Sequence, residues 1–215
     1  MRMRLILASG SPRRQRMLLD LGLAFEVIPA GIDETSARGE APLACARRLA
    51  REKARAAVRK IGYGGPDLDG FRFENDWAVL AADTIVVLEK RMLGKPLDAA
   101  DGLKMLKRLS GRSHSVVTAW SWLGRRSGRI LETGGHARTI VTFARRPASF
   151  WKWYLSTGEP MDKAGAYAAQ GIGMSFIDRV RGSYSNVVGL PLSNVLENFR
   201  VAFKKDIREL CRQRH

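Results

Sequence analysis

Apolar and polar residues follow one another along this chain in blocks that predict short strands alternating with helices. Leu5 to Ala8 is a short apolar run, and the Ser11-Pro12 pair that follows is typical of the start of a helix, which Gly22 then ends. Phe25 to Pro29 predicts a second short strand. Ala41 to Ile61 predicts a long helix, because its apolar residues return about every 3.6 positions.

The most apolar stretch, Trp77 to Leu88, predicts a pair of buried central strands interrupted by Asp83-Thr84. Asp98 predicts the cap of a helix that runs to about Leu109. Gly62 to Asp76, with its glycines and aspartates, is the segment that the sequence favours as a flexible insertion. The remaining elements follow from the same patterns: a β-hairpin of Ser115 to Leu123 with Arg138 to Phe143, a helix from Pro147 to Ser156, an extended segment from Gly173 to Val180, and an amphipathic helix from Leu192 to Arg212.

This order of elements predicts an α/β fold with a mixed central sheet flanked by helices. We interpret residues 1–215 as a single domain, with a cleft between two lobes. Hydrophobic residues make up 45% of the 215, enough to bury a core, and the apolar runs are far shorter than the ~18 residues of a membrane-spanning helix. We therefore expect no membrane partner. The two cysteines have no CxxC spacing, which argues against a disulfide framework or a zinc site and fits a cytoplasmic location.

Charge changes this picture, since 37 Lys and Arg residues against 21 Asp and Glu residues leave a net charge of +16. Such a balance favours a polyanionic partner. Nucleic acid, an anionic membrane surface and a small phosphorylated substrate all meet that demand, and net charge alone does not separate them. The basic residues are dispersed and alternate with apolar ones at helical spacing, which is also the pattern of solvated helix faces.

The first candidate site is the segment between the first predicted strand and helix, which contains Ser9, Arg13 and Arg14. A strand that feeds a glycine-containing turn and then a helix presents free backbone N–H groups and the positive end of the helix dipole, which together suit a phosphate. Two arginines in a first helical turn oppose that dipole unless an anion lies in front of them. The alternative is that both arginines point into water.

The second candidate is Asp83, because a carboxylate within an apolar strand is costly unless it is paired, hydrogen-bonded or bound to a metal. Its alternative role is to cap a turn. Lys53 borders the apolar stripe of its predicted helix and could reach a cleft. Lys95 follows a tight turn, where it either holds a phosphate or is simply solvated. Asp33-Glu34 after Gly31 adds further carboxylates, although this pair also fits a charged surface turn. Carboxylate oxygens suit Mg²⁺ or Mn²⁺, and Glu34 and Asp83 are the candidate ligands.

These residues fall within motifs that follow one another over nearly the whole chain. The motifs are Leu7 to Arg14, Gly31 to Glu34, Arg51 to Ala54, Ala82 to Thr84, Gly94 to Pro96, Gly111 to Val116, Asp162 to Gly171, and Gly182 to Pro191. In this order they resemble the Maf family of nucleoside triphosphate pyrophosphatases.

The resemblance implies metal-dependent hydrolysis of a nucleoside triphosphate to the monophosphate and pyrophosphate, in a cleft of an α/β fold similar to that of inosine-triphosphate pyrophosphatases. It implies three roles for the candidate residues. Ser9, Arg13, Arg14, Lys53 and Lys95 would contact the phosphates, Asp83 would be the general base, and Arg13, Thr84 and Gln170 would govern the choice of substrate.

The stretch that ends at Gln170 is similar to the branch of the family that acts on dTTP and UTP, with Ala169 where that branch often has a bulkier residue. Hydrolysis of methylated GTP is an alternative within the family, and a basic nucleic-acid-binding module is the alternative outside it. A binding module would not need Asp83, and the sequence lacks the aromatics between basic residues typical of single-strand platforms. Trp151 and Trp153 predict either core packing or a contact in a homodimer.

Overall fold

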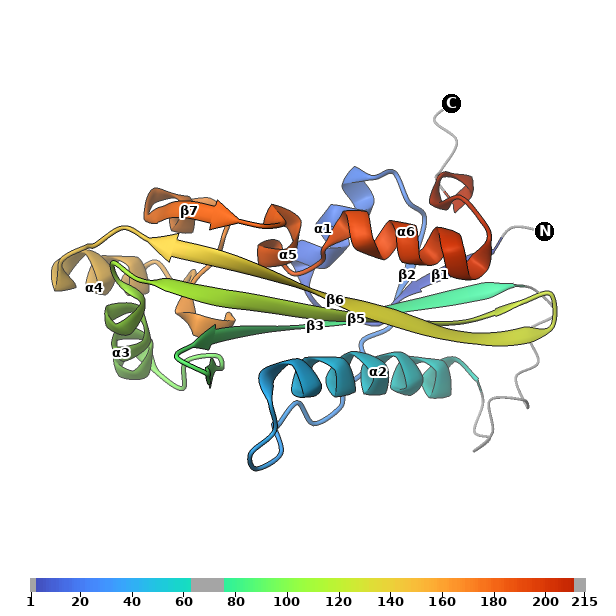
Figure 1. Ribbon diagram of the computed structural model, residues 1–215, viewed down its shortest axis with the longest axis horizontal. Helices are drawn as coiled ribbons and strands as arrows, with labels where there is room; N and C mark the ends of the chain where they lie inside the picture. Colours follow the sequence, from blue (N-terminus) through green and yellow to red (C-terminus); the bar gives the residue numbers. More distant parts are fainter. Residues whose placement is uncertain (1–2, 63–75, 211–215) are drawn as a thin grey trace. The chain divides into compact units, whose positions relative to one another are not determined.

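The computed structural model describes residues 3–62 and 76–210. The predicted flexible insertion, Gly62 to Asp76, lies outside the described residues apart from its two ends. Figure 1 shows the strands and helices that the described residues form. The strands are β1 (Arg4–Leu7), β2 (Glu26–Val27), β3 (Trp77–Leu88), β4 (Arg91–Leu93), β5 (Ser113–Arg126), β6 (Arg129–Phe143) and β7 (Ile177–Arg181).

Helices alternate with strands from β1 to β3, as the hydrophobic pattern predicts, and β5 and β6 follow each other directly. Asp98 caps its helix as expected, since its carboxylate accepts a hydrogen bond from the backbone N–H of Asp101. The α-helices are α1 (Pro12–Asp20), α2 (Pro42–Ile61), α3 (Ala99–Leu109), α4 (Ala148–Ser156), α5 (Tyr184–Val188) and α6 (Leu192–Phe203). Short 3₁₀ helices are η2 (Ala164–Ala166), η3 (Gly171–Ser175) and η4 (Ile207–Leu210).

The described strands form one seven-stranded mixed sheet in the order β2-β1-β3-β5-β6-β7, with β4 paired to β3. β1 pairs in parallel with β2 and β3, whereas β3 with β4 and β6 with β7 pair antiparallel. The sheet with its flanking helices confirms the predicted α/β class. No helix in the described ranges combines the length and hydrophobicity that a crossing of a membrane requires.

The chain divides into two compact units. Unit 1 consists of residues 1–83, 119–136 and 192–215, and unit 2 of residues 84–118 and 137–191.

The core of unit 1 has helices on two faces of its strands. Alternate residues of a strand point to opposite faces, so that Val79 and Ala81 of β3 pack with Ala54 of α2. On the other face, Trp122 of β5 contacts Phe199 of α6, with ring centroids 4.9 Å apart. Figure 1 shows α2 and α6 on these opposite sides of the strands. In unit 1, the side chains on one face of α2 therefore point toward one face of β3.

The core of unit 2 is an aromatic cluster. Phe143 of β6 lies with its ring centroid 4.9 Å from that of Phe176, and Tyr154 of α4 is also 4.9 Å from Phe176. Trp151 is fully buried in the same cluster, whereas Trp153 is 51% exposed. Of the two predicted roles, core packing is therefore confirmed for Trp151.

Trp77 to Leu88 forms one continuous strand, so the prediction of two strands interrupted by Asp83-Thr84 is wrong. The strand continues through Asp83 because its buried carboxylate is paired with the Lys53 ammonium, which offsets the cost of burying the charge. The predicted hairpin is also longer than expected, because β5 and β6 continue to a two-residue turn at Ser127 and Gly128. Both turn residues have positive φ, as the tight turns that match the twist of a hairpin require.

Two further segments differ from their predictions. The segment predicted as extended from Gly173 to Val180 begins within η3, and only its second half is strand β7. The last helix ends at Phe203 rather than near Arg212, because Lys204 takes a left-handed conformation with φ of 42°. The chain then turns so that Leu210, in η4, is buried separately.

Candidate active site

The turn between β1 and α1 brings Ser9 and Arg14 together in unit 1. The Ser9 hydroxyl oxygen accepts hydrogen bonds from the Ser11 backbone N–H at 3.2 Å and from an Arg14 guanidinium N–H at 3.1 Å. Burial lowers the pKa of Arg14, the nearby charge of Arg13 lowers it further, and the carboxylates of Asp83 and Glu34 raise it. A bound anion would stabilise the charge of this buried guanidinium, and the start of a helix also favours an anion.

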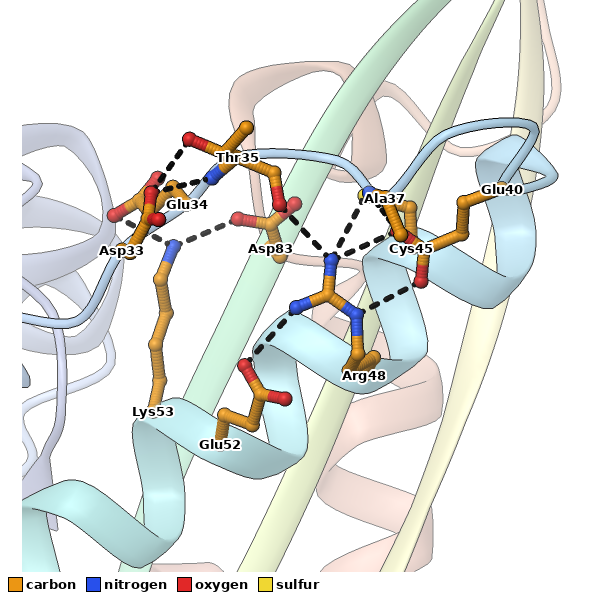
Figure 2. Close-up of polar contacts among 10 residues, drawn as sticks. All are labelled: Asp33, Glu34, Thr35, Ala37, Glu40, Cys45, Arg48, Glu52, Lys53 and Asp83. Carbon is orange, nitrogen blue, oxygen red and sulfur yellow. Dashed lines mark hydrogen bonds and ion pairs between the residues drawn. The ribbon is translucent and has the colours of Figure 1, made fainter.

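A second group of predicted residues meets around the Lys53 ammonium, also in unit 1. Lys53 Nζ donates to Asp83 Oδ1 at 2.7 Å and lies 3.0 Å from Glu34 Oε1 (Figure 2). The side chains of Lys53 and Asp83 are each 9% exposed, whereas that of Glu34 is 54% exposed. The ion pair is thus buried at one end and open to solvent at the other.

Helical and strand periodicity explain how Lys53 and Asp83 meet. Asp83 is in phase with Trp77, Val79 and Ala81 of β3, so its side chain is on the face that α2 covers. Lys53 precedes Ala54 at the edge of the apolar stripe of α2, and it is buried, as the sequence predicts for a lysine at the border of that stripe. The buried Lys53 ammonium is the partner that the buried Asp83 carboxylate needs.

Asp33, the neighbour of Glu34, has a structural role. Its carboxylate accepts hydrogen bonds from the backbone N–H of Thr35 at 2.9 Å and from the Thr35 hydroxyl at 2.6 Å, which shapes a turn. The carboxylate of Glu34 reaches Lys53 instead (Figure 2). The two neighbouring carboxylates therefore separate into one that forms the turn and one that forms the ion cluster.

Arg48 is a supporting residue that the sequence analysis missed. Its guanidinium donates to both carboxylate oxygens of Glu40 at 2.8 Å, to the Thr35 carbonyl at 3.1 Å and to Glu52 at 3.1 Å (Figure 2). The bond from Arg48 is the main reason that the pKa of Glu40 falls to about 2. These contacts tie the loop that follows Glu34 to α2. The i, i+4 pair of Arg48 and Glu52 was readable in the sequence, but the contact with the loop was not.

Thr84, the first residue of unit 2, is held by neighbouring polar groups. Its hydroxyl lies 2.9 Å from the Thr118 hydroxyl, which donates to the backbone carbonyl of Asn186 at 3.1 Å. The Asn186 amide is fully buried and donates to the Val116 carbonyl and to the Thr139 hydroxyl. Asn186 thus fixes the strand segments around Thr84, which gives a structural reason for the motif from Gly182 to Pro191.

Lys95 and Gln170 also belong to unit 2, and both are exposed. The backbone next to Lys95 is fixed, because the Gly94 carbonyl accepts from the Gly165 N–H at 2.9 Å. A Cβ atom at Gly165, where φ is +71°, would lie 3.0 Å from Val86, so a larger residue would be strained there. The structure therefore brings together Ser9 with Arg14, and Lys53 with Asp83 and Glu34, within unit 1. A common site that includes Thr84, Lys95 and Gln170 stays a prediction.

The chemistry of the donors fits a divalent cation. Glu34 and Asp83 both direct a carboxylate oxygen at the same ammonium, within 3.0 Å and 2.7 Å, so a positive charge is stabilised between them. Nowhere in residues 3–62 and 76–210 do three His, Cys, Asp or Glu side chains cluster as metal ligands. The protein would thus supply two carboxylates, and substrate oxygens would complete the shell, as is common for Mg²⁺.

Comparisons with known proteins show the family to which the chain is similar. Residues 4–202 match the family described as Maf-like protein. The chain belongs to the Maf family. A dTTP/UTP pyrophosphatase from Syntrophus aciditrophicus (strain SB) is 46% identical, over 92% of this chain and 89% of its own. The dTTP/UTP pyrophosphatase of Anaeromyxobacter dehalogenans (strain 2CP-1 / ATCC BAA-258) is 47% identical, over 93% of this chain and 94% of its own.

Proposed function

We propose that this protein hydrolyses nucleoside triphosphates to the monophosphate and pyrophosphate, with dTTP and UTP as the preferred substrates. The observation that carries the proposal is the cluster in which Lys53 binds Asp83 at 2.7 Å and Glu34 at 3.0 Å. A shielded carboxylate beside an open one can activate water and hold a cation next to a phosphate chain. The names of the two relatives, which are 46% and 47% identical to this chain over the aligned 197 and 199 residues, support the same reaction.

In the proposed reaction, Asp83 accepts a proton from a water molecule as the water oxygen attacks the α-phosphorus. The bond from the α-phosphorus to its bridging oxygen breaks, and pyrophosphate leaves with the electron pair. Ser9, Arg13, Arg14, Lys53 and Lys95 stabilise the negative charge on the phosphate oxygens. Electrostatic stabilisation of this kind is the main catalytic contribution in phosphoryl transfer.

Glu34 and Asp83 would hold Mg²⁺ or Mn²⁺. When bound, the ion would neutralise charge on the phosphate oxygens. The exposure of Glu34, 54% for its side chain, supports this role, because a ligand that faces solvent can turn toward an arriving metal–nucleotide complex. Lys53 would keep the buried Asp83 carboxylate paired in the absence of substrate.

Base selection is assigned to Arg13, Thr84 and Gln170. A glutamine amide carries both a donor and an acceptor, which are the groups needed to pair with the O4 and N3–H edge of uracil or thymine. Cytosine reverses this pattern at both positions. A polar group left unpaired in a buried complex costs ~1–3 kcal/mol, so CTP should be hydrolysed about tenfold to a hundredfold less efficiently than UTP.

We place the activity in a single domain over residues 1–215 and in the cytoplasm. The family match over residues 4–202 supports one functional domain. Cys45 is a free, buried thiol, and its pKa is raised to about 11, chiefly by burial, so it is not a reactive cysteine. A reduced, inert cysteine fits the cytoplasm. The homodimer stays a prediction.

The test is an assay of pyrophosphate release from the common nucleoside triphosphates and methylated GTP, with Mg²⁺, Mn²⁺ or a chelator. We expect dTTP and UTP to be hydrolysed best and the chelator to abolish turnover. Preference for methylated GTP would move the protein to the other branch of the family. An absence of pyrophosphate from every substrate, combined with salt-sensitive binding of RNA, would replace the proposal with the nucleic-acid-binding alternative.

A further inference from the structure

Gln170 lies on a short loop of unit 2 whose backbone is held on both sides of it. The loop runs from Ala168 to Gly173, and Gln170 and Gly171 are its exposed residues. On the near side, the Ala168 N–H donates to the Tyr154 hydroxyl oxygen at 3.1 Å. The Ala169 carbonyl accepts from the Tyr184 hydroxyl at 3.0 Å. These two contacts fix the chain immediately before Gln170.

On the far side, a single carboxylate binds the loop. Glu159 Oε2 accepts from the Ile172 N–H at 3.0 Å, and Glu159 Oε1 accepts from the Gly173 N–H at 3.1 Å. Glu159 Oε1 also accepts from the Tyr154 hydroxyl at 2.8 Å, so the residue that holds Ala168 is itself held by Glu159. Glu159 and Tyr154 therefore form one clamp that binds the loop before and after Gln170.

The loop is shaped to fit this carboxylate closely. Gly171 has φ of +66°, and a Cβ atom there would lie 2.5 Å from Glu159 Oε2. A Cβ atom at Gly173 would lie 1.8 Å from the Ala168 carbonyl oxygen, so the two ends of the loop approach each other. Gly171 is favoured by its left-handed backbone conformation, and Gly173 by the close approach of the Ala168 carbonyl. The two glycines and the carboxylate thus act together to define one loop conformation.

We propose that Glu159 is a positioning residue for base selection, which holds the backbone of residues 168–173 so that the Gln170 amide occupies one fixed place. The proposal rests on the proposed function, in which Gln170 reads the base. Fixed placement matters because discrimination between uracil and cytosine depends on a donor and an acceptor being presented in register. A loop that moves by the length of a hydrogen bond lets either base find a partner.

Glu159→Gln is the appropriate change, because it preserves size while removing one acceptor. An amide has a single acceptor oxygen, so its NH₂ group must face either the Ile172 N–H or the Gly173 N–H. One of these backbone groups then loses its partner. We expect the ratio of kcat/KM for UTP over CTP to fall about tenfold, through a higher KM for UTP, with kcat for UTP changed less than threefold. Tyr154→Phe, which breaks the other half of the clamp, should lower the same ratio.

The matched control is Glu197→Gln, which removes a carboxylate from an exposed ion pair with Arg200 in unit 1. It should leave the UTP to CTP ratio unchanged. A merely structural role for Glu159 would lower kcat for all substrates together, so an equal loss on UTP and CTP would overturn the proposal. Hydrogen exchange at Ile172 and Gly173 should become faster in Glu159→Gln while the rest of unit 2 keeps its protection.

A double-mutant cycle with Gln170→Ala completes the test. Gln170→Ala alone should lower the UTP to CTP ratio, and Glu159→Gln should have no further effect on the ratio in that background. Equal effects of Glu159→Gln in both backgrounds would overturn the proposal, because Glu159 would then act without Gln170. If Gln170→Ala leaves the ratio unchanged while UTP is still hydrolysed, Gln170 does not select the base. The positioning role of Glu159 is then wrong as well. If wild-type protein releases no pyrophosphate, the proposed function itself has failed.

Discussion

The Lys53 cluster of unit 1 and the Glu159 clamp of unit 2 satisfy their carboxylates in different ways. In unit 1, Lys53, Asp83 and Glu34 satisfy one another through charge, with distances of 2.7 and 3.0 Å. In unit 2, Glu159 satisfies backbone N–H groups, and the loop conformation depends on it. An ammonium can exchange a carboxylate for a phosphate when a ligand arrives, whereas a backbone N–H cannot leave its loop. The difference predicts that ligand binding rearranges charges around Lys53 in unit 1 and leaves the Glu159 loop of unit 2 unchanged.

Asp83→Asn is the change expected to have the largest effect, and it acts on unit 1 alone. The amide oxygen can still accept from Lys53, so the fold is retained, but the side chain no longer takes up a proton. Loss of a general base lowers kcat by about 10² to 10⁴. The measurement is pyrophosphate release from dTTP and UTP, with circular dichroism to confirm folding.

Asp76→Asn is the control for this prediction, because the Asp76 carboxylate accepts from the backbone N–H of Ser127 at 2.8 Å rather than from the Lys53 ammonium. It should keep near-normal kcat. The UTP to CTP ratio should survive in the residual activity of Asp83→Asn, since the unit 2 loop is untouched. Near-normal turnover by folded Asp83→Asn would remove Asp83 from the chemistry.

Local patterns were sufficient to predict most of the elements and that Asp83 has a partner. The 3.6-residue period placed α2 and put Lys53 at the edge of its buried face, and the cost of a buried carboxylate indicated a partner for Asp83. The same reasoning failed where it took Asp83 as a break in the strand. Whether a polar residue interrupts a strand depends on its partner, which comes from a helix 30 residues earlier.

The loop contacts of Arg48 and Glu159 could not be predicted from the sequence because both contacts are made with backbone groups. Arg48 binds the Thr35 carbonyl, and Glu159 binds the Ile172 and Gly173 N–H groups. Backbone groups are present at every residue, so neither residue type nor spacing shows which of them a side chain will reach. Only the folded arrangement of loops identifies such contacts.

Arg13→Ala should have the second largest effect, again confined to unit 1. Arg13 is partly exposed in the first turn of α1, next to the anion position formed by Ser9 and Arg14. Hydrogen bonds to charged groups contribute about 1.5–3 kcal/mol, so the KM for dTTP should rise roughly tenfold to over a hundredfold. Initial rates over a range of dTTP concentrations measure this change.

Arg16→Ala is the matched control on the same helix, since Arg16 forms an exposed i, i+4 ion pair with Asp20 at 2.8 Å. It should change the KM by less than twofold and the free energy of unfolding by less than about 0.5 kcal/mol. Equal effects of the two substitutions would mean that the arginines of α1 act only through overall charge. Unit 1 would then have no specific anion site at the start of α1, and the contrast with the fixed loop of unit 2 would no longer hold.

The smallest expected effect concerns the core of unit 2 and its dependence on pH. His114 lies against the rings of Phe143 and Tyr167, and its Nε2 is 2.7 Å from the Tyr167 hydroxyl. In the described part of the chain its buried Nδ1 has no hydrogen-bond partner. A charged imidazole needs partners for both N–H groups, and burial accordingly lowers the pKa of His114 to about 4. The neutral ring is therefore part of the folded state.

Because this pKa is lower in the folded protein than the ordinary 6.5, the unfolded chain binds more protons between these values. The stabilisation is complete above about pH 6.5 and declines by about 1.4 kcal/mol per pH unit as the pH falls toward 4. Urea unfolding at pH 7 and pH 5 should show this loss in the wild type and a smaller loss in His114→Phe. An NMR titration of the histidine rings reads the pKa directly, whatever the stability of the variant. A titration of His114 near pH 6.5 would show that water reaches the ring. The core of unit 2 would then open to solvent, which would contradict the fixed shape that the Glu159 contacts give to this unit.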